Sequence, residues 1–444
     1  MTKASRIGPL FTDLYELTMA AGYYEHHMFY PAVFTLFVRG YPVHRNYFVA
    51  AGLEDALREL EQFRFSQDEL NYLKTTHLFS NAFLSFLKAF RFSGNIVALS
   101  EGTIFFENEP ILEVEASLIE AQLIETFLLN TIGSQTLIAS KAARCVHAAN
   151  GLPLIDFSLR RTQGQDAGLH VARSTHIVGF TATSNVLAGK MYHIPISGTM
   201  AHSFVMAFEK EMDAFSAYSK TFPHNTVLLI DTYDTLEGAR NAARIAHEMK
   251  TRNASLMGVR LDSGDMVDLS VKVRNILDEA GLHDVKILVS SGFDEYGIAD
   301  VLSKGAKIDG FGVGTKLGVS ADAPFMDIVY KLARLNDRDV RKLSPGKVTL
   351  AGKKQVFRST DSTGTYREDI IGCRNERIEE SMPLLEKVME NGKIHGPYPS
   401  LQIIRDRFKH NFSCLPEKYK DLSQDTPRYP VKLSRQLEDL QNRV

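Results

Sequence analysis

The stretch NTVLLIDTYDTLEGARNAARIAHEMKTRNASLMGVRLDSGD, residues 225–265, decides the fold class of this chain. It opens with an apolar run, continues with a helix-length segment and closes with a second apolar run. Apolar residues in TLEGARNAARIAHEMKTRN recur at intervals of three and four, which predicts an amphipathic helix long enough to join two parallel strands. Each apolar run ends in acidic and hydroxyl residues. The stretch therefore predicts a βαβ unit with polar groups at the carboxyl ends of its strands.

The same rhythm extends over residues 152–313. Short apolar runs alternate with longer segments, and most of the runs are nearly continuous, as a parallel sheet buried on both faces requires. The pattern gives seven candidate strands, which are LPLIDF, HIVGF, HIPIS, NTVLLID, SLMGVRL, VKILVSS and KIDGFGV. Repeated βα units of this kind predict either a parallel barrel or an open doubly wound sheet.

The two ends of the chain have a different texture. FTLFVR and residues 95–116 are dense in β-branched and aromatic residues, which predicts strands, and ASLIEAQLIETFLLNTI predicts a helix. After about residue 335 the chain returns to a charged strand-and-turn pattern that includes KVTLAGKKQVFR, and it closes with a polar helical tail. We therefore expect residues 1–128 and 336–444 to form one domain, and residues 129–335 to form an α/β catalytic domain between them.

Composition and charge exclude several classes of protein. The 444 residues hold 51 Lys and Arg against 53 Asp and Glu, a balance that argues against a chain built to coat nucleic acid or an anionic membrane. Cys145, Cys373 and Cys414 lie far apart, so they predict neither a disulfide framework nor a zinc site. No run of 18 apolar residues occurs, and Asp13 and Glu16 interrupt a signal core. We expect a soluble, cytoplasmic protein.

Polar and glycine-rich segments follow the candidate strands. These segments are SLRRTQG, GTMAHS, DTYDT, DSGD, SSGFDE and GVGTKLG. Barrels and open parallel sheets place their sites at the carboxyl ends of strands. One turn of glycine, serine and aspartate is usually only a turn, but six in register within one domain predict a functional site.

Two of these segments are suited to binding anions. In GFGVGTKLG, residues 310–318, glycines let backbone N–H groups approach a phosphate and Thr315 adds a donor. The segment lacks the order of a Walker loop, and a turn that closes a barrel is the alternative. Arg160 and Arg161 can bind phosphate or carboxylate through two hydrogen bonds each, although an exposed basic turn would have the same sequence.

Acidic residues are paired after two neighbouring strands. Asp231 and Asp234 follow one strand, and Asp262 and Asp265 follow the next. Carboxylates can hold Mg²⁺ or accept hydrogen bonds from ribose hydroxyls. The alternative is that some of them cap the helices that come next.

His202 lies in SGTMAHSF, directly after a short apolar run. A single histidine beside Met and Phe is more often structural than catalytic. Its position at a strand end, between Thr199 and Ser203, instead favours a nucleophile or a proton carrier.

Taken together, these segments resemble the nicotinate phosphoribosyltransferase family over essentially the whole chain. The motifs that carry the resemblance, in order, are TDLYELTM, FVAAGLE, DFSLRRTQG, TATSNVLAG, SGTMAHSF, IDTYDT, GVRLDSGD and GFGVGT. The resemblance implies an irregular parallel α/β barrel, of the type II phosphoribosyltransferase kind, with an α/β sandwich domain formed from both chain ends. It also implies a head-to-tail homodimer with active sites shared between subunits.

The implied activity joins nicotinate to phosphoribosyl pyrophosphate, giving nicotinate mononucleotide and pyrophosphate in NAD biosynthesis from the free base. ATP hydrolysis would assist the reaction as a co-substrate, and Mg²⁺ would be the cofactor. Ribosyl transfer passes through a transition state of oxocarbenium character, in which positioning and stabilisation of the leaving group matter most. No structural metal is implied, because the chain lacks the cysteine cluster of zinc-binding relatives.

The resemblance also implies roles for individual residues. His202 would be phosphorylated transiently by ATP. The residues that would contact nicotinate are Tyr15, Phe157, Ser184, Thr199 and Arg260, with Tyr15 supplied by the partner chain. The residues that would bind phosphoribosyl pyrophosphate are Arg39, Arg160, Asp262, Ser291, Gly292, Gly314, Thr315, Lys342 and Lys354.

Two other functions remain open on the sequence. Nicotinamide phosphoribosyltransferases have a similar fold, with an acidic residue at the position of Ser184. A carboxylate there would repel nicotinate, whereas a hydroxyl can donate a hydrogen bond to it, so we expect a preference for the acid. A non-catalytic nucleotide-binding protein on the same scaffold is the second alternative. His202 and the intact strand-end motifs argue against it.

Overall fold

The computed structural model describes residues 8–423 and 427–444, and the chain divides into two compact units. Met1–Ser140 and Phe325–Val444 form the terminal unit, and Lys141–Pro324 form the central unit. The central unit is therefore shorter than the expected span of residues 129–335. Strand β12 (Ile328–Leu335) accounts for part of the difference, because it pairs with β1 (Pro31–Val38) in the terminal unit.

The central unit contains the parallel sheet that the sequence predicts, with strand order β7-β6-β11-β10-β9-β8. Its strands are β6 (Leu154–Asp156), β7 (Ala182–Thr183), β8 (Thr226–Leu229), β9 (Leu256–Leu261), β10 (Lys286–Ser290) and β11 (Gly310–Val313). Side chains such as Leu228, Val259, Ile287 and Phe311 are buried, which explains the continuous apolar runs. The sheet has the form of a half-barrel.

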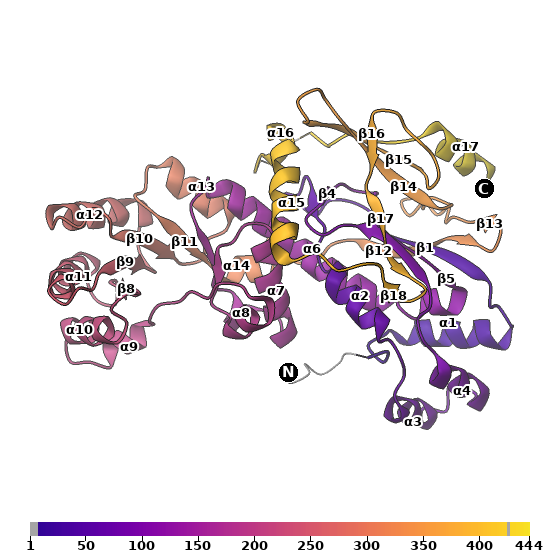
Figure 1. The fold of residues 1–444 in the computed structure, drawn as a ribbon, viewed down its shortest axis with the longest axis horizontal. Helices are drawn as coiled ribbons and strands as arrows, with labels where there is room; N and C mark the ends of the chain where they lie inside the picture. The colour runs from indigo at the N-terminus through magenta and orange to yellow at the C-terminus, as the bar shows by residue number, and fades with distance from the viewer. Residues whose placement is uncertain (1–7, 424–426) are drawn as a thin grey trace. The chain divides into compact units, whose positions relative to one another are not determined.

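Helices follow the strands of this sheet (Figure 1). They are η1 (Leu159–Arg161), α7 (Gln165–Ile177), α8 (Val186–Tyr192), α9 (His202–Met206), α10 (Glu211–Thr221), α11 (Thr235–Lys250), α12 (Met266–Glu279), α13 (Glu295–Ser303) and α14 (Thr315–Gly318). Small residues, namely Gly238 and four alanines, make up much of the buried face of α11, so the helix packs closely against its neighbours α10 and α12.

Two of the seven candidate strands are corrected by the structure. HIVGF, residues 176–180, is the end of α7 and the turn after it, and the strand lies at Ala182–Thr183 instead. HIPIS, residues 193–197, contributes only an isolated parallel bridge between Thr183 and Ile196. The reason is that a short apolar run fits a buried helix end as well as a buried strand, and periodicity does not separate the two.

The terminal unit is built on a seven-stranded antiparallel sheet with the order β13-β12-β1-β5-β3-β17-β18. The interior strand β1 pairs with β5 on one side and with β12, from the other end of the chain, on the other. The remaining strands of this sheet are β3 (Asn95–Leu99), β5 (Pro110–Ser117), β13 (Arg338–Asp339), β17 (Leu385–Glu390) and β18 (Lys393–Ile394). Both chain ends are therefore needed for one sheet, which confirms the expected sandwich domain.

Two further sheets complete the terminal unit. The four-stranded sheet has the order β16-β14-β15-β19, and β2 pairs with β4. These strands are β14 (Lys354–Thr360), β15 (Tyr366–Cys373), β16 (Ser381–Pro383), β19 (Val431–Leu433), β2 (Phe48–Val49) and β4 (Ile104–Phe105). A large apolar core joins the seven-stranded sheet to the helices that cover it (Figure 1).

The helices of the terminal unit come mostly from its N-terminal part. They are α1 (Leu14–Glu25), α2 (Leu53–Glu61), α3 (Gln67–Thr75), α4 (Asn81–Ala89), α5 (Leu118–Gln122), α15 (Leu401–Cys414), α16 (Glu417–Lys420) and α17 (Arg435–Arg443). Helix α6 (Glu125–Ala148) begins in the terminal unit and contributes its last residues to the central unit. Within residues 8–423 and 427–444, no helix is long and apolar enough to cross a membrane.

Candidate active site

Most of the predicted site residues lie along one edge of the central unit, at the carboxyl ends of its strands. They are Phe157 and Arg160 after β6, Ser184 after β7, Thr199 and His202 before and in α9, Arg260 and Asp262 at β9, Ser291 and Gly292 after β10, and Gly314 and Thr315 after β11. Because all six strands are parallel, their carboxyl ends meet at the same edge of the sheet.

Arg260 and Thr199, both predicted to contact nicotinate, are bonded to each other. Arg260 Nη1 donates to Thr199 Oγ1 at 2.6 Å, and Nη2 donates to the carbonyl oxygen of Met200 at 3.0 Å. Burial lowers the pKa of Arg260 from its ordinary value, although an arginine stays protonated. Its buried Nε has no hydrogen-bond partner among the described residues. The guanidinium is thus held through both Nη atoms, and its Nε–H remains for an anion.

His202, the first residue of α9, is held through one ring nitrogen. Its Nδ1 lies 3.1 Å from the hydroxyl oxygen of Thr232, and its Nε2 lies 3.8 Å from Asp262 Oδ2. The His202 side chain is 38% exposed, so the ring can be reached from solvent. A histidine with one nitrogen oriented and the other accessible can act as a nucleophile or carry a proton.

Asp231 and Asp262 form a linked pair at the ends of β8 and β9. Asp231 Oδ2 accepts hydrogen bonds from the backbone N–H of Asp262 at 2.8 Å and from the Ser263 hydroxyl at 2.7 Å. The hydroxyl of Ser290 donates to Asp262 Oδ1. The other oxygen of Asp231 is buried and has no partner among the described residues. This oxygen is available to a hydroxyl group or a cation.

The other two acidic residues of these loops are helix caps, as the alternative interpretation supposes. Asp234 Oδ1 accepts from the N–H of Glu237 at 2.8 Å and begins α11. Asp265 accepts from the N–H groups of Val267 and Asp268 and begins α12.

Phe157 lies where the β6 and β11 strand ends come closest. Its N–H donates to the carbonyl oxygen of Val313 at 2.8 Å. A Cβ atom on Gly312 would come within 2.4 Å of the Phe157 ring, and one on Gly314 within 3.2 Å of the Phe157 carbonyl oxygen. Glycine is therefore required at position 312 to leave room for the ring.

The loop between β10 and α13 has an unusual backbone conformation. Ser291 has φ of +123° and Gly292 has φ of +66°. A non-glycine residue in this region is strained, and such strain is concentrated at functional sites. Asp294 caps α13 through the N–H of Gly297 at 2.9 Å and pairs with Lys316 at 3.0 Å. The loop is thereby anchored to α14, which begins at Thr315.

The remaining predicted residues, Tyr15, Arg39, Lys342 and Lys354, belong to the terminal unit. Tyr15 is exposed on α1, and burial of its hydroxyl with the nearby carboxylates Glu125 and Glu16 raises its pKa, so the phenol stays neutral. Lys342 is exposed in the loop before β14. Their proposed contacts with substrate stay predictions.

Arg39 and Lys354 have partners within the terminal unit. Arg39 Nη1 lies 3.8 Å from Asp327 Oδ1. The ammonium group of Lys354 lies 3.0 Å from Glu113 Oε1 and donates to the carbonyl oxygens of Leu350 and Gly352. These three contacts use all the donors of Lys354.

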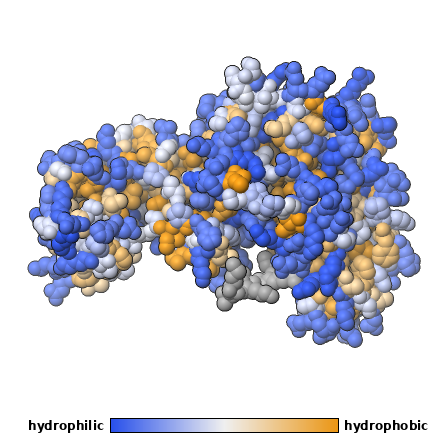
Figure 2. Space-filling view, viewed as in Figure 1, coloured by the Kyte–Doolittle hydropathy of each residue, from blue (hydrophilic) through white to orange (hydrophobic). Residues whose placement is uncertain are grey.

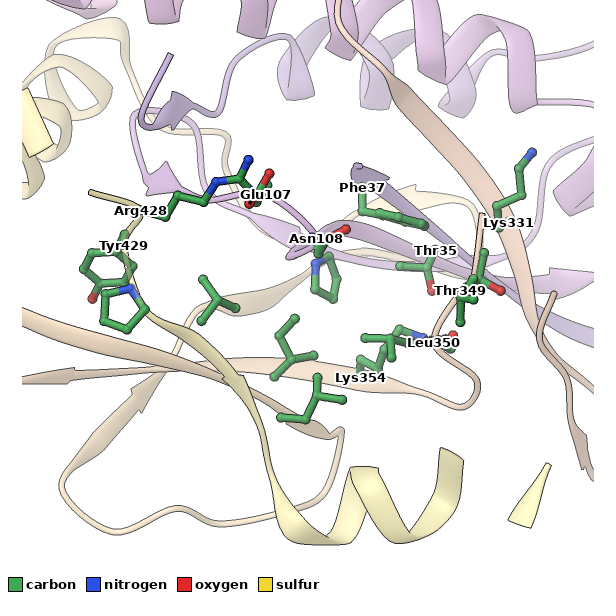
Figure 3. Close-up of a pocket in the computed structure, with 16 residues that line it drawn as sticks. Thr35, Phe37, Glu107, Asn108, Lys331, Thr349, Leu350, Lys354, Arg428 and Tyr429 are labelled. Carbon is green, nitrogen blue, oxygen red and sulfur yellow. Dashed lines mark hydrogen bonds and ion pairs between the residues drawn. The ribbon is translucent and has the colours of Figure 1, made fainter. Parts of the chain in front are cut away.

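A cavity of about 560 Å³ lies inside the terminal unit, and Lys354 is one of its lining residues (Figure 3). Apolar side chains form much of its wall, including Phe37, Ile371, Val431 and Leu433. Its charged lining residues are all in ion pairs, namely Lys331 with Glu125, Lys354 with Glu113 and Arg428 with Glu107. Each charged residue of the cavity wall thus has a partner within the terminal unit.

The sequence interpretation missed three residues that position the site. Thr232 orients His202, and the buried carboxylate of Asp156 accepts a hydrogen bond from Thr183. Asp156 lies in the run LPLIDF, which the apolar pattern predicts only as a buried strand. An acidic residue inside an otherwise apolar strand end is the signal that could have revealed it.

Comparison with known proteins agrees with this geometry. The N-terminal domain of nicotinate phosphoribosyltransferase matches residues 10–133, the nicotinate phosphoribosyltransferase family matches residues 152–362, and the C-terminal domain matches residues 378–441.

Individual proteins match over nearly the whole chain. The nicotinate phosphoribosyltransferase pncB2 of Mycobacterium tuberculosis is 45% identical, over 98% of this chain and 93% of its own. That of Bacillus subtilis is 40% identical, over 96% of this chain and 92% of its own. The crystal structure of human nicotinic acid phosphoribosyltransferase superposes with a TM-score of 0.88 at 28% identity, over 98% of this chain and 99% of its own. With three domains matched in order and relatives aligned from end to end, this chain belongs to the nicotinate phosphoribosyltransferase family.

Proposed function

We propose that this chain catalyses the reaction of its family, in which nicotinate and phosphoribosyl pyrophosphate give nicotinate mononucleotide and pyrophosphate. The ring nitrogen of nicotinate attacks C1 of the ribose with its lone pair, and the bond between C1 and the pyrophosphate oxygen breaks. The observation that carries the proposal is Arg260, whose guanidinium is fixed by Thr199 while its buried Nε has no partner among the described residues. That arrangement suits the carboxylate of nicotinate.

Recognition of the base would combine stacking with hydrogen bonds. Phe157 offers a ring held over Gly312, and Tyr15, from a second copy of the chain, would cover the other face of the pyridine. Ser184, just beyond β7, would donate to the substrate carboxylate. A hydroxyl at this position favours nicotinate over nicotinamide, because it does not repel the negative charge.

The phosphoribosyl group would lie along the same edge. Asp262 would accept hydrogen bonds from ribose hydroxyls, beside the available oxygen of Asp231. The proposed phosphate contacts in this unit are Arg160, Ser291, Gly292, Gly314 and Thr315. Arg39, Lys342 and Lys354 would reach the pyrophosphate from the second copy, and Lys354 would first have to exchange its present partners.

Mg²⁺ fits this edge as an ion that arrives with the substrate. Among residues 8–423 and 427–444, no three His, Cys, Asp or Glu side chains are grouped to hold a metal ion. Mg²⁺ commonly uses one or two carboxylates together with substrate phosphates, and Asp231 and Asp262 offer them. When bound, the ion would neutralise charge on the pyrophosphate.

ATP would act through His202. The accessible Nε2 would attack the γ-phosphorus, the bond to ADP would break, and water would later release phosphate from the histidine. The phosphorylated ring would add negative charge beside Asp262 and Thr232, and it would order the loops that close over the substrate. Ribosyl transfer itself does not require this step.

We propose a homodimer as the active form. Each unit carries an exposed apolar surface that a second copy can cover. On the terminal unit the surface is Phe11, Leu14, Tyr15 and Met19 along α1, and on the central unit it is Val186, Leu187, Met191 and Ile196 around α8. Figure 2 shows apolar side chains gathered over α8. Exposed apolar patches of this kind mark association surfaces. Leu14→Glu and Val186→Glu should each give monomers with little activity, measured by light scattering and product formation.

The test of the proposed function uses His202→Asn, with His247→Asn as control because His247 is an exposed residue of α11. Incubation with γ-labelled ATP should place acid-labile label on the wild type and on the control. The His202 variant should take up no label, lose ATP hydrolysis and keep slow, ATP-independent synthesis of the mononucleotide.

Three outcomes would change the assignment. Normal labelling of the His202 variant would move the phosphate acceptor to another residue. Turnover of nicotinamide equal to or better than that of nicotinate would instead identify the chain as a nicotinamide phosphoribosyltransferase. Absence of pyrophosphate release with all three substrates and Mg²⁺ would support a non-catalytic protein.

A further inference from the structure

Asp156 closes β6 with a side chain that is 0% exposed. Its Oδ1 accepts from the backbone N–H of Ser158 at 2.9 Å and from the Ser158 hydroxyl at 2.6 Å, and its Oδ2 accepts from the Thr183 hydroxyl at 2.7 Å. One carboxylate thus ties the chain that leaves β6 to the chain at the end of β7.

A carboxylate is a costly choice for that purpose. All three hydrogen bonds come from neutral donors, and burial raises the pKa of Asp156 above its ordinary value even though these bonds oppose the change. Burying a charged group costs far more than burying a neutral one, so a chain that only needed to join two strands would be better served by a neutral side chain. The buried carboxylate of Asp156 is therefore better explained by a role in the candidate site than by a role in joining the strands.

The residues on either side of this tie supply the reason. Phe157 lies between Asp156 and Ser158, both of which the tie holds. Ser184 follows Thr183, and its own N–H donates to the carbonyl oxygen of Asp156 at 2.8 Å. Side chain and backbone of Asp156 therefore set the positions of two residues proposed to contact nicotinate.

We infer that Asp156 is a positioning residue for the pyridine base, because it fixes the separation between the Phe157 ring and the Ser184 hydroxyl. This inference rests on the proposed contacts of Phe157 and Ser184 with nicotinate. A change in that separation moves the hydroxyl relative to the carboxylate of a base stacked on Phe157. Selection of the acid over the amide therefore depends on a residue that does not touch the substrate.

The chain offers a pair of variants for the test, at the buried Thr183 and at the more exposed Thr181. The hydroxyls of Thr183 and Thr181 both link β6 to the β7 segment, since Thr183 donates to the Asp156 carboxylate and Thr181 donates to the carbonyl oxygen of Leu154 at 3.0 Å. Valine removes the hydroxyl and keeps the shape at each position. Thr183→Val should raise the KM for nicotinate about tenfold, the effect of losing one hydrogen bond to a charged group, and lower the preference for nicotinate over nicotinamide.

Thr181→Val should lower the melting temperature without changing the KM for nicotinate or the preference for nicotinate over nicotinamide. The KM for phosphoribosyl pyrophosphate should stay within about twofold of the wild-type value in both variants, well below a tenfold effect. Asp156→Asn should raise the KM for nicotinate as Thr183→Val does, but by a smaller factor. The amide oxygen still accepts from Ser158, whereas the amide nitrogen cannot accept from Thr183.

The inference is overturned if the two threonine variants lose stability alike and neither changes the KM for nicotinate. It is also overturned if Thr183→Val changes the KM for phosphoribosyl pyrophosphate instead. Ser184→Ala and Phe157→Leu separate this failure from that of the proposed contacts. If these two leave the KM for nicotinate unchanged, the contacts themselves are misassigned. If they raise it while Thr183→Val does not, only the role of Asp156 fails.

Discussion

The Glu113 cluster of the terminal unit and the strand-end charges of the central unit are both buried, but their hydrogen bonds are satisfied to different degrees. In the terminal unit, Glu113 Oε1 accepts from the Thr35 hydroxyl at 2.8 Å and forms an ion pair with Lys354 Nζ at 3.0 Å. Its other oxygen accepts from the Lys354 N–H at 3.0 Å and from Arg374. In the central unit, Arg260 Nε and Asp231 Oδ1 are buried without a partner among the described residues.

The difference separates structural charges from functional ones. A buried group that its own unit satisfies has nothing left for a ligand, and its removal exposes the partners to an uncompensated charge. A buried group with an unused donor or acceptor is costly until a ligand completes it. Unused hydrogen-bonding capacity marks a candidate site only together with its position at the strand ends, because Glu109 Oε1 and Arg358 Nη1 in the terminal unit are also buried without a partner among the described residues.

The largest effect should come from the satisfied cluster. Glu113→Ala leaves the Lys354 ammonium and the Arg374 guanidinium without their buried carboxylate, so we expect the free energy of unfolding to fall by about 3–5 kcal/mol. Denaturant unfolding of the purified variant measures this loss.

Glu115→Ala is the control for that experiment. Glu115 pairs with Lys353 and Arg374 next to Glu113 but is partly exposed, so its loss should cost less than about 1 kcal/mol. Equal losses for the two variants would show that the buried cluster is no more structural than a surface ion pair.

The next effect concerns the unsatisfied arginine. Arg260→Ala should reduce kcat/KM for nicotinate at least about 30-fold, because about 2 kcal/mol or more is lost when one partner of a buried charge pair is removed. Arg260→Lys keeps the charge but not the planar donors, and it should recover only part of the loss. Steady-state kinetics with nicotinate and nicotinamide distinguish the contributions. An equal loss for both substrates would show that Arg260 does not recognise the carboxylate of nicotinate.

A third prediction concerns a buried carboxyl group whose pKa is raised by its surroundings. Burial and the neighbouring Asp369 raise the pKa of Glu109 well above its ordinary value, while Arg358 opposes the shift. The folded state therefore keeps a proton that the unfolded state loses. This contribution to stability is complete below the ordinary pKa of about 4.3 and declines as the pH rises towards the folded pKa.

Glu109→Gln cannot titrate, so it removes this contribution to the pH dependence. The difference in unfolding free energy between the variant and the wild type should rise in favour of the variant by up to about 1.4 kcal/mol per pH unit. Unfolding curves recorded at several pH values between about 5 and 8 measure this difference in unfolding free energy. A difference that does not vary with pH would mean that Glu109 is ionised in the folded protein.

The smallest expected effect belongs to Thr232. Thr232→Val removes the hydrogen bond to His202 Nδ1 at 3.1 Å and leaves the ring free to rotate. A neutral hydrogen bond contributes about 1 kcal/mol, so the rate of phosphate transfer from ATP should fall about fivefold. Pulse-labelling with γ-labelled ATP measures the rate. An unchanged rate would show that Thr232 does not orient the ring.

The sequence by itself determined the architecture and the edge that carries the site. The apolar runs and helix-length segments of residues 152–313 predict a parallel sheet, because burial on both faces imposes a pattern that is local in the chain. Polar residues after each run follow from the same local order. The family motifs extend along the whole chain, so family membership also needed no structure.

Only the tertiary structure decided how the site residues are paired. Arg260 and Thr199 are 61 positions apart, His202 and Thr232 are 30 apart, and Lys354 and the Glu113 carboxylate are 241 apart. Position in the chain alone does not distinguish Asp262 from Asp234 and Asp265, which cap helices, because all three follow strands. HIVGF likewise became a helix end because its apolar side chains are buried in either form. The physical reason is common to these cases: local pattern fixes which face of an element is buried, whereas hydrogen-bond partners depend on which elements the fold brings together.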